Sequence, residues 1–220
     1  MRPLAVTLGD PAGIGPEITA KAWSALRNGG PAFFVCAQLA PIAEALASLG
    51  LPPPATVASP SEAQIRFHEA LPVLAAANAS ATRPRMVVDS IVSAVGLVQS
   101  GAVSGLVTNP IHKKSLYDAG FDFPGHTEFL AHLTGAKDAI MMLAIEGLRV
   151  VPVTVHMSVA DAVKALTVDK IVHAARVTDR ELAAKFGVAQ PRLAIAALNP
   201  HAGEDGALGL EEKTIIGPAI

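Results

Sequence analysis

The sequence predicts a layered α/β protein, in which helices cover a mostly parallel sheet. Short apolar runs, mostly rich in β-branched residues and typical of buried strands, alternate along the chain with longer segments whose apolar residues recur at helical spacing. The chain has 220 residues, of which 51% are hydrophobic and 16% charged, so it can bury a substantial core and is too apolar to be disordered.

The expected elements follow these patterns in chain order. Strands are expected at the short apolar runs, which are residues 4–8, 32–37, 105–108, 139–144, 148–155 and 192–197. Helices are expected between them at residues 16–26, 41–49, 86–99, 128–133, 159–166 and 169–186. The proline-rich residues 51–85 are interpreted as a loop-rich excursion. Because no internal repeat supports a division, residues 1–220 are interpreted as one catalytic α/β unit, with two interleaved subdomains as the alternative.

Charge and cysteine content exclude several classes of protein. The formal net charge of −2, with mixed signs, argues against a nucleic-acid partner, so a phosphate-bearing ligand would be small and held by local donors. The single cysteine, Cys36, allows no internal disulfide and is expected in the core. The N-terminus lacks a signal peptide pattern, and no window approaches an uncharged apolar span of about 18 residues. We therefore expect a cytoplasmic protein without membrane contact.

The most informative segment is residues 199–204 (NPHAGE), followed by two further glycines and a pair of acids. It places His201 in a glycine-rich loop after an apolar run, and His156 follows another apolar run in the same way. Open parallel sheets bind ligands beyond the carboxyl ends of their strands. Two imidazoles at two strand ends therefore suggest a divalent metal site, although a histidine there can also serve only as a cap or hydrogen-bonding group.

Residues 9–17 (GDPAGIGPE) connect the first strand to a helix, where a dinucleotide-binding fingerprint would lie. The glycine spacing is wrong for that fingerprint, and no acidic residue ends the second strand. A Rossmann site is therefore not expected. The alternative is structural: the glycines make the turn, and Pro16 occupies the first turn of the helix.

Two other loops carry candidate binding groups. Residues 124–128 (PGHTE) precede a helix, whose free backbone N–H groups, together with His126 and Thr127, would suit a carboxylate or phosphate. Alternatively, Thr127 caps that helix. Residues 108–113 (TNPIHK) follow a strand, and Lys113 or Lys114 would bind an anion unless both are merely solvated.

The joint order of these motifs, from residue 7 to residue 220, resembles the 4-hydroxythreonine-4-phosphate dehydrogenase family of pyridoxal phosphate biosynthesis. The resemblance implies a fold like that of isocitrate and isopropylmalate dehydrogenases, which bind NAD without the usual glycine fingerprint. It also implies a homodimer with the site at the subunit interface. His156 and His201 would be metal ligands, and His126 and Thr127 would contact the small phosphorylated substrate.

The implied reaction is oxidation of 4-phosphohydroxy-L-threonine by NAD or NADP, with decarboxylation to 3-amino-2-oxopropyl phosphate. A divalent metal would lower the pKa of the reacting hydroxyl. Zinc suits imidazole ligands, magnesium prefers oxygen, and cobalt is the third candidate. Neither the proton acceptor nor the cofactor-binding residues can be assigned from the sequence.

The chain departs from the family pattern in two places. His112 stands where the family usually has asparagine, and the chain ends in an apolar run, short of the usual family length, as expected of a truncated chain. A third metal-binding histidine and further substrate contacts would lie beyond residue 220. Residues 1–220 alone are therefore expected to show no dehydrogenase activity.

Three alternatives remain open. One is a related dehydrogenase of another phosphorylated four-carbon hydroxy acid or of a cyclic diol. A second is a metal-dependent hydrolase that needs no nicotinamide. The third is a chain that binds its ligand without turnover.

Overall fold

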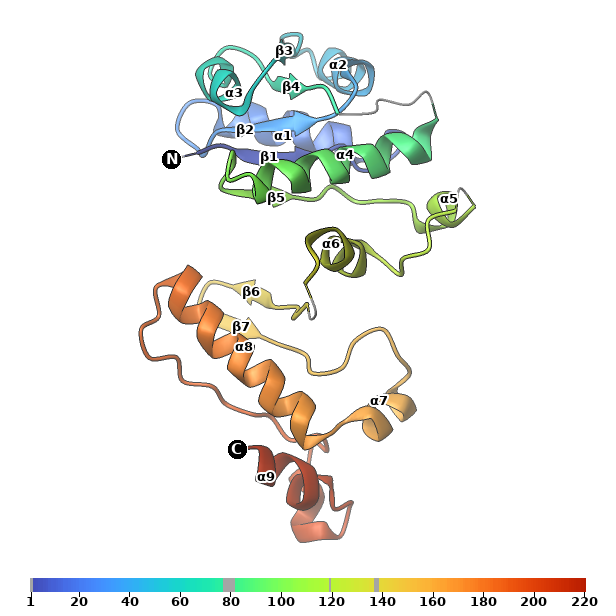
Figure 1. Ribbon diagram of the computed structural model, residues 1–220, viewed down its shortest axis with the longest axis vertical. Coiled ribbons are helices and arrows are strands. Elements are labelled where there is room, and N and C mark those ends of the chain that lie inside the picture. Colours follow the sequence, from blue (N-terminus) through green and yellow to red (C-terminus); the bar gives the residue numbers. More distant parts are fainter. Residues whose placement is uncertain (1, 77–81, 119, 137–138) are drawn as a thin grey trace. The chain divides into compact units, whose positions relative to one another are not determined.

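The computed structural model describes residues 2–76, 82–118, 120–136 and 139–220 (Figure 1). The chain divides into two compact units, unit 1 (Met1–Lys137) and unit 2 (Asp138–Ile220). This division does not say which residues share a site, so the interpretation of the chain as one catalytic unit stays a prediction.

Unit 1 is built on a five-stranded sheet in the order β3-β4-β2-β1-β5, and every neighbouring pair is parallel. The strands are β1 (Leu4–Thr7), β2 (Phe33–Cys36), β3 (Ala55–Val57), β4 (Pro72–Leu74) and β5 (Gly105–Val107). The three expected strands in this part of the chain are confirmed, with slightly shorter ends. β1 and β2 are almost fully buried, which explains their nearly continuous apolar sequences.

Helices cover both faces of this sheet, as Figure 1 shows. On one face, Val6 packs in a cluster with Trp23 of α1 (Gly15–Leu26) and Ile42 of α2 (Leu39–Ser48). On the other face, Cys36 packs in a cluster with residues of α3 (Pro60–Arg66) and α4 (Arg83–Gln99). Burial raises the pKa of the Cys36 thiol to about 12, and its expected core position is confirmed. The predicted αβα layering is therefore present in unit 1.

Two further helices lie against the outer side of α4. They are α5 (Lys113–Tyr117) and α6 (His126–Thr134). Leu116 of α5 and Phe129 of α6 share a buried cluster with Val87 and Ile91 of α4. This cluster fixes the helix that begins with His126 and Thr127 to the body of unit 1.

The interpretation of residues 51–85 as a loop-rich excursion is wrong, because this segment holds β3, α3 and β4. Its prolines stand where regular structure tolerates them. Pro60 occupies the first turn of α3, behind Ser59, whose hydroxyl accepts the Glu62 backbone N–H at 3.2 Å. Pro72 is the first residue of β4, where a missing N–H is tolerated.

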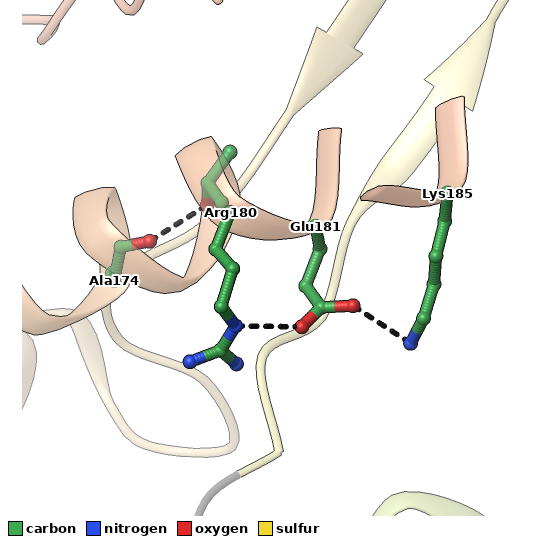
Figure 2. Close-up of polar contacts among 5 residues, drawn as sticks. Ala174, Arg180, Glu181 and Lys185 are labelled. Carbon is green, nitrogen blue, oxygen red and sulfur yellow. Dashed lines mark hydrogen bonds and ion pairs between the residues drawn. The ribbon is translucent and has the colours of Figure 1, made fainter. Parts of the chain in front are cut away.

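Unit 2 combines a hairpin with helices. β6 (Leu143–Ile145) and β7 (Leu148–Val150) pair antiparallel, and α7 (Val159–Ala165) and α8 (Val168–Phe186) follow. The buried residues of α8, at helical spacing, are Ile171, Ala174, Thr178 and Leu182. On α8, Figure 2 shows Glu181 between Arg180 and Lys185, whose nitrogens lie 2.9 and 2.7 Å from its carboxylate. No helix that the structure describes is long and apolar enough to cross a membrane.

The prediction of buried strands at residues 139–144, 148–155 and 192–197 is largely wrong. Only parts of the first two form strands, and Leu143 and Ile145 are 60% and 70% exposed. Residues 192–197 form no strand in the described part of unit 2. Most of them line a groove of about 610 Å³ beside α8. An apolar run indicates that burial is favourable, but it does not specify a hydrogen-bonding partner strand.

Candidate active site

The carboxyl ends of β1 and β5 form the switch point of the unit 1 sheet. From β1 the chain continues through α1 to β2 on one side, whereas β5, which follows α4, pairs with β1 on the other side. Open α/β sheets bind ligands at such a point. The glycine-rich turn after β1 meets the loop after β5 here, because the Asp10 N–H donates to the Pro110 carbonyl at 2.9 Å.

A buried amide, Asn109, joins the two loops. Its Nδ2 donates to the Thr7 carbonyl at 2.8 Å and to the Thr19 hydroxyl at 2.7 Å, and its backbone N–H donates to the Thr7 hydroxyl at 3.1 Å. The Thr19 hydroxyl in turn donates to the Gly15 carbonyl. These three polar side chains are at most 5% exposed. Sequence reasoning missed Asn109, because its partners lie far away along the chain.

Gly9 is required by this close approach of the two loops. An ideal Cβ at Gly9 would lie 2.6 Å from Asn109 Cβ and 2.7 Å from the Pro110 carbonyl oxygen, and Gly9 has φ of +68°. Both the contact and the left-handed backbone favour glycine. This supports the structural interpretation of these glycines as turn residues.

The beginnings of α5 and α6 bring Lys113 and His126 together. The Tyr117 hydroxyl donates to the Pro124 carbonyl at 3.2 Å, which ties the turn before α6 to α5. Gly125 is the N-cap of α6 and has no side chain to cap it, so the alternative that Thr127 caps this helix is wrong. An ideal Cβ at Gly125 would lie 3.6 Å from Glu128 Oε2 and 3.8 Å from Lys113 Nζ, so a carboxylate and an ammonium group both border this position. The missing side chain leaves space beside an ammonium group and an uncapped helix N-terminus, an arrangement that suits an anion.

His126 is held in its neutral form at this position. Burial, and then the nearby charge of Lys113, lower the pKa of its imidazole below the usual 6.5. Its Nε2 is buried and has no hydrogen-bond partner among the described residues. A buried polar atom without a partner is costly, and an incoming ligand group would satisfy it. The sequence-predicted pair His126 and Thr127 therefore lies beside Lys113 at a site with unused binding capacity.

His201 lies in a strained loop of unit 2. The loop contains the short helix η1 (Ala202–Gly206), in which Ala202, Glu204 and Asp205 all have positive φ. His201 is exposed, and its Nδ1 lies 3.5 Å from a Glu204 carboxylate oxygen. Non-glycine residues in the left-handed region cost free energy and often mark functional sites.

His156 is also exposed and has φ of +56° in the segment between β7 and α7. β7 ends at Val150, well before His156, and residues 192–200, directly before His201, form no strand. The expected position of both imidazoles at strand ends is therefore wrong. Both residues nevertheless stand in exposed loops, and left-handed backbone occurs at His156 itself and directly after His201, at Ala202.

The donor set in unit 2 suits a divalent metal in its chemistry but is incomplete. Imidazoles are good ligands for zinc and cobalt. A carboxylate beside one ring nitrogen commonly orients a metal-binding histidine, and the Glu204 carboxylate lies beside His201 Nδ1 in this way. No group of three or more His, Cys, Asp or Glu side chains that could hold a metal occurs within residues 2–76, 82–118, 120–136 and 139–220. A catalytic zinc usually has three protein ligands, so His156 and His201 would be part of a set.

A separate pocket of about 360 Å³ lies in unit 1, lined by Arg2, Leu4 and His68 among others. Arg2 and Leu4 stand at the amino end of β1. This pocket therefore lies away from the carboxyl ends where the loops described above meet, and it does not coincide with the candidate anion site.

Comparisons with known proteins identify the family of the chain. The family model described as pyridoxal phosphate biosynthetic protein PdxA matches residues 32–220. The 4-hydroxythreonine-4-phosphate dehydrogenase of Caulobacter vibrioides is 50% identical over 100% of this chain and 69% of its own length. That of Xanthobacter autotrophicus is 44% identical over 99% of this chain and 66% of its own length.

Solved structures give the same assignment. The 4-hydroxythreonine-4-phosphate dehydrogenase of Klebsiella pneumoniae matches with a TM-score of 0.85 and 33% identity, over 100% of this chain and 71% of that one. A terephthalate 1,2-cis-dihydrodiol dehydrogenase of Burkholderia xenovorans LB400 matches with a TM-score of 0.65 and 25% identity, over 99% and 68% of the two chains. The predicted fold, like that of isocitrate and isopropylmalate dehydrogenases, is thereby confirmed. The chain belongs to the PdxA family of 4-hydroxythreonine-4-phosphate dehydrogenases, which act in pyridoxal phosphate biosynthesis.

Proposed function

We propose that the protein oxidises 4-phosphohydroxy-L-threonine with NAD or NADP and a divalent metal, and releases carbon dioxide and 3-amino-2-oxopropyl phosphate. Its family membership supports the reaction class. The observation that carries the proposal is the cluster of Lys113, the N-terminus of α6 and the half-buried, neutral His126. That cluster suits the phosphate of a small substrate.

Lys113 and the first turn of α6 bind the phosphate in this proposal. The ammonium group supplies charge, and the free N–H groups of α6 supply directed donors. Thr127 adds a hydroxyl within the first turn. His126 Nε2 contacts the same ligand, and binding of an anion raises the pKa of His126 because it stabilises the imidazolium form.

The reaction removes a hydride from the carbon that bears the 3-hydroxyl and a proton from the hydroxyl oxygen. The resulting β-keto acid then loses carbon dioxide and gains a proton. NAD or NADP, when bound, accepts the hydride. A divalent metal, when bound, supplies Lewis acidity at the reacting oxygens. His156 and His201 hold this metal in the proposal, with zinc, magnesium and cobalt as the candidate ions.

The family resemblance also supports a homodimer with the site at the subunit interface, and the single buried cysteine supports a cytoplasmic location. Light scattering after gel filtration tests the oligomeric state. A mass that corresponds to two chains is expected, and a monomer at working concentration contradicts the proposal.

Phosphate recognition is tested by comparing kcat/KM for 4-phosphohydroxy-L-threonine and for unphosphorylated 4-hydroxy-L-threonine in the complete protein encoded by the gene. Lys113→Met should lower kcat/KM only for the phosphorylated substrate. The matched control is Lys114→Met, since Lys114 is exposed and pairs with Asp118 at 3.1 Å. Equal losses on both substrates, or equal effects of the two variants, contradict the role of Lys113.

A second candidate function is oxidation of a cyclic cis-dihydrodiol. The observation that favours it is the structural match to a terephthalate 1,2-cis-dihydrodiol dehydrogenase. That match is weaker in both TM-score and identity than the match to the Klebsiella enzyme. NADH formation from a cis-dihydrodiol but not from 4-phosphohydroxy-L-threonine would favour the second function. Turnover without any nicotinamide would instead indicate a metal-dependent hydrolase.

A further inference from the structure

The loop that carries His201 is tied to the C-terminal helical turns of unit 2 by one carboxylate. Glu212 begins the π-helical turn η2 (Glu212–Ile216), and its Oε1 accepts the backbone N–H of Asn199 at 2.9 Å. This hydrogen bond is the main reason that the pKa of Glu212 lies below its usual value. The carboxylate is therefore ionised over the physiological pH range, and its bond to Asn199 is charge-assisted.

The second carboxylate oxygen of Glu212 is enclosed by the same loop. Oε2 is buried and has no hydrogen-bond partner among the described residues. An ideal Cβ at Gly203 would lie only 2.8 Å from it, and Gly203 has φ of +72°. The left-handed backbone and the Gly209 carbonyl oxygen, 3.1 Å from the same ideal Cβ, both favour glycine at position 203. An enclosed carboxylate oxygen without a partner costs free energy, and such cost is a common feature of functional sites.

Asn199 links Glu212 to His201 by hydrogen bonds. Its side-chain Oδ1 accepts the His201 backbone N–H at 2.9 Å, and its Nδ2 donates to the Leu208 carbonyl at 3.3 Å. Asn199 is thus held by Glu212 through its backbone and holds His201 through its side chain.

We propose that Glu212 is a positioning residue for His201, acting through Asn199 to hold the imidazole where it serves as a metal ligand. This inference rests on the metal role given to His201 in the proposed function. Residues that orient a metal ligand typically contribute about 10- to 100-fold to metal affinity. Glu212 itself faces the loop backbone and does not bind the metal.

The test uses Glu212→Ala, Glu212→Gln and the control Glu211→Ala in the chain of residues 1–220. Glu211 is the adjacent acid and the N-cap of the same turn. Glutamine keeps an oxygen that accepts the Asn199 N–H, whereas alanine removes it. Hydrogen exchange of residues 199–206, followed by mass spectrometry without added metal, should be about tenfold faster or more in Glu212→Ala. Glu212→Gln and Glu211→Ala should exchange like the wild type.

Metal affinity is then measured by titration with Co²⁺ alone and visible spectroscopy. Glu212→Ala should weaken Co²⁺ binding by about 10- to 100-fold, and Glu212→Gln should restore most of it. Asn199→Ala, which keeps the backbone bond to Glu212 but removes the side-chain link to His201, should weaken binding similarly. If Glu212→Ala fails to fold, Asn199→Ala still tests the link to His201, because unchanged Co²⁺ affinity in that variant overturns the inference.

The outcomes separate this inference from the proposed function. Unchanged hydrogen exchange in Glu212→Ala overturns the inference whether or not metal binds. Faster exchange with unchanged Co²⁺ affinity, in a chain where His201→Ala loses the metal, also overturns it. If the wild type and His201→Ala show the same Co²⁺ titration, the proposed metal role fails. Faster exchange in that case leaves Glu212 with a purely structural role, which contradicts the inference as well.

Discussion

Replacement of Asn109 by alanine should destabilise unit 1 substantially. The substitution removes the Nδ2 bonds to the Thr7 carbonyl and the Thr19 hydroxyl and leaves both buried acceptors short of a partner. Each lost bond costs about 1 kcal/mol, and unsatisfied buried acceptors add to this cost. We expect the free energy of unfolding to fall by about 2–4 kcal/mol, a large part of the roughly 5–15 kcal/mol typical of a domain.

The assay is urea unfolding followed by tryptophan fluorescence. Trp23 is the only tryptophan in the chain and is fully buried in unit 1, so its emission reports this unit. The matched control is Asn199→Ala, which removes the same amide from unit 2 and should leave the Trp23 transition unchanged. If Asn109→Ala lowers the free energy of unfolding by less than about 1 kcal/mol, the reasoning is refuted, because the effect would then be close to that of a substitution at an exposed position.

A double-mutant cycle with Thr19→Val isolates the contact itself. Thr19→Val also removes the bond to the Gly15 carbonyl, so the single variants alone overstate the contact. The coupling free energy between positions 109 and 19 should be about 1 kcal/mol. A coupling indistinguishable from zero would mean that Asn109 does not join the two loops through Thr19.

Three further predictions concern the proposed binding residues. His156→Ala and His201→Ala should each lower the metal content after dialysis, measured by elemental analysis. Because two histidines are an incomplete ligand set, residues 1–220 should hold the metal weakly. Unchanged metal content in both variants would place the metal elsewhere. Thr127→Ala should lower kcat/KM for 4-phosphohydroxy-L-threonine by a factor worth about 1–3 kcal/mol; a loss of thermal stability with unchanged kinetics would contradict a substrate contact. Lys113→Met should raise the pKa of His126 in an NMR titration, because it removes one of the two causes that lower it, and an unchanged pKa would show that Lys113 is too distant. In the wild type, the pKa of His126 is lower in the folded chain than in the unfolded chain. As the pH falls through 6.5, the unfolded chain therefore binds more protons at His126 than the folded chain does, and the free energy of unfolding should fall.

The sequence predicted the fold best where burial alone decides the structure. β1 and β2 lie in the middle of a covered parallel sheet, so their apolar runs were sufficient. β3 and β4 have three residues each and lie among prolines, and their formation depends on pairing with each other and with β2. Residues 192–197 have the composition of a strand but pair with nothing in the described part of unit 2. Local patterns cannot specify such pairing.

The sequence likewise indicated only part of the candidate site, namely the candidate binding residues and not the residues that position them. His126, Thr127 and Lys113 were predicted as candidates because charged and hydrogen-bonding groups after a strand or before a helix indicate ligand binding. Asn109 and Glu212 were missed as positioning residues, because their importance depends on partners brought close only by folding. Because each of these residues is far from its partner in the sequence, no local pattern indicates the contact.

The proposed function is metal-dependent oxidation of 4-phosphohydroxy-L-threonine with a nicotinamide cofactor. Its most direct test is NADH or NADPH formation by the complete protein encoded by the gene, measured before metal removal, after removal with a chelator, and after readdition of zinc, cobalt or magnesium. Reduced nicotinamide is expected with the native protein, none after metal removal, and recovery with at least one of these ions. Equal rates before and after metal removal, or consumption of the substrate without nicotinamide reduction, would contradict it.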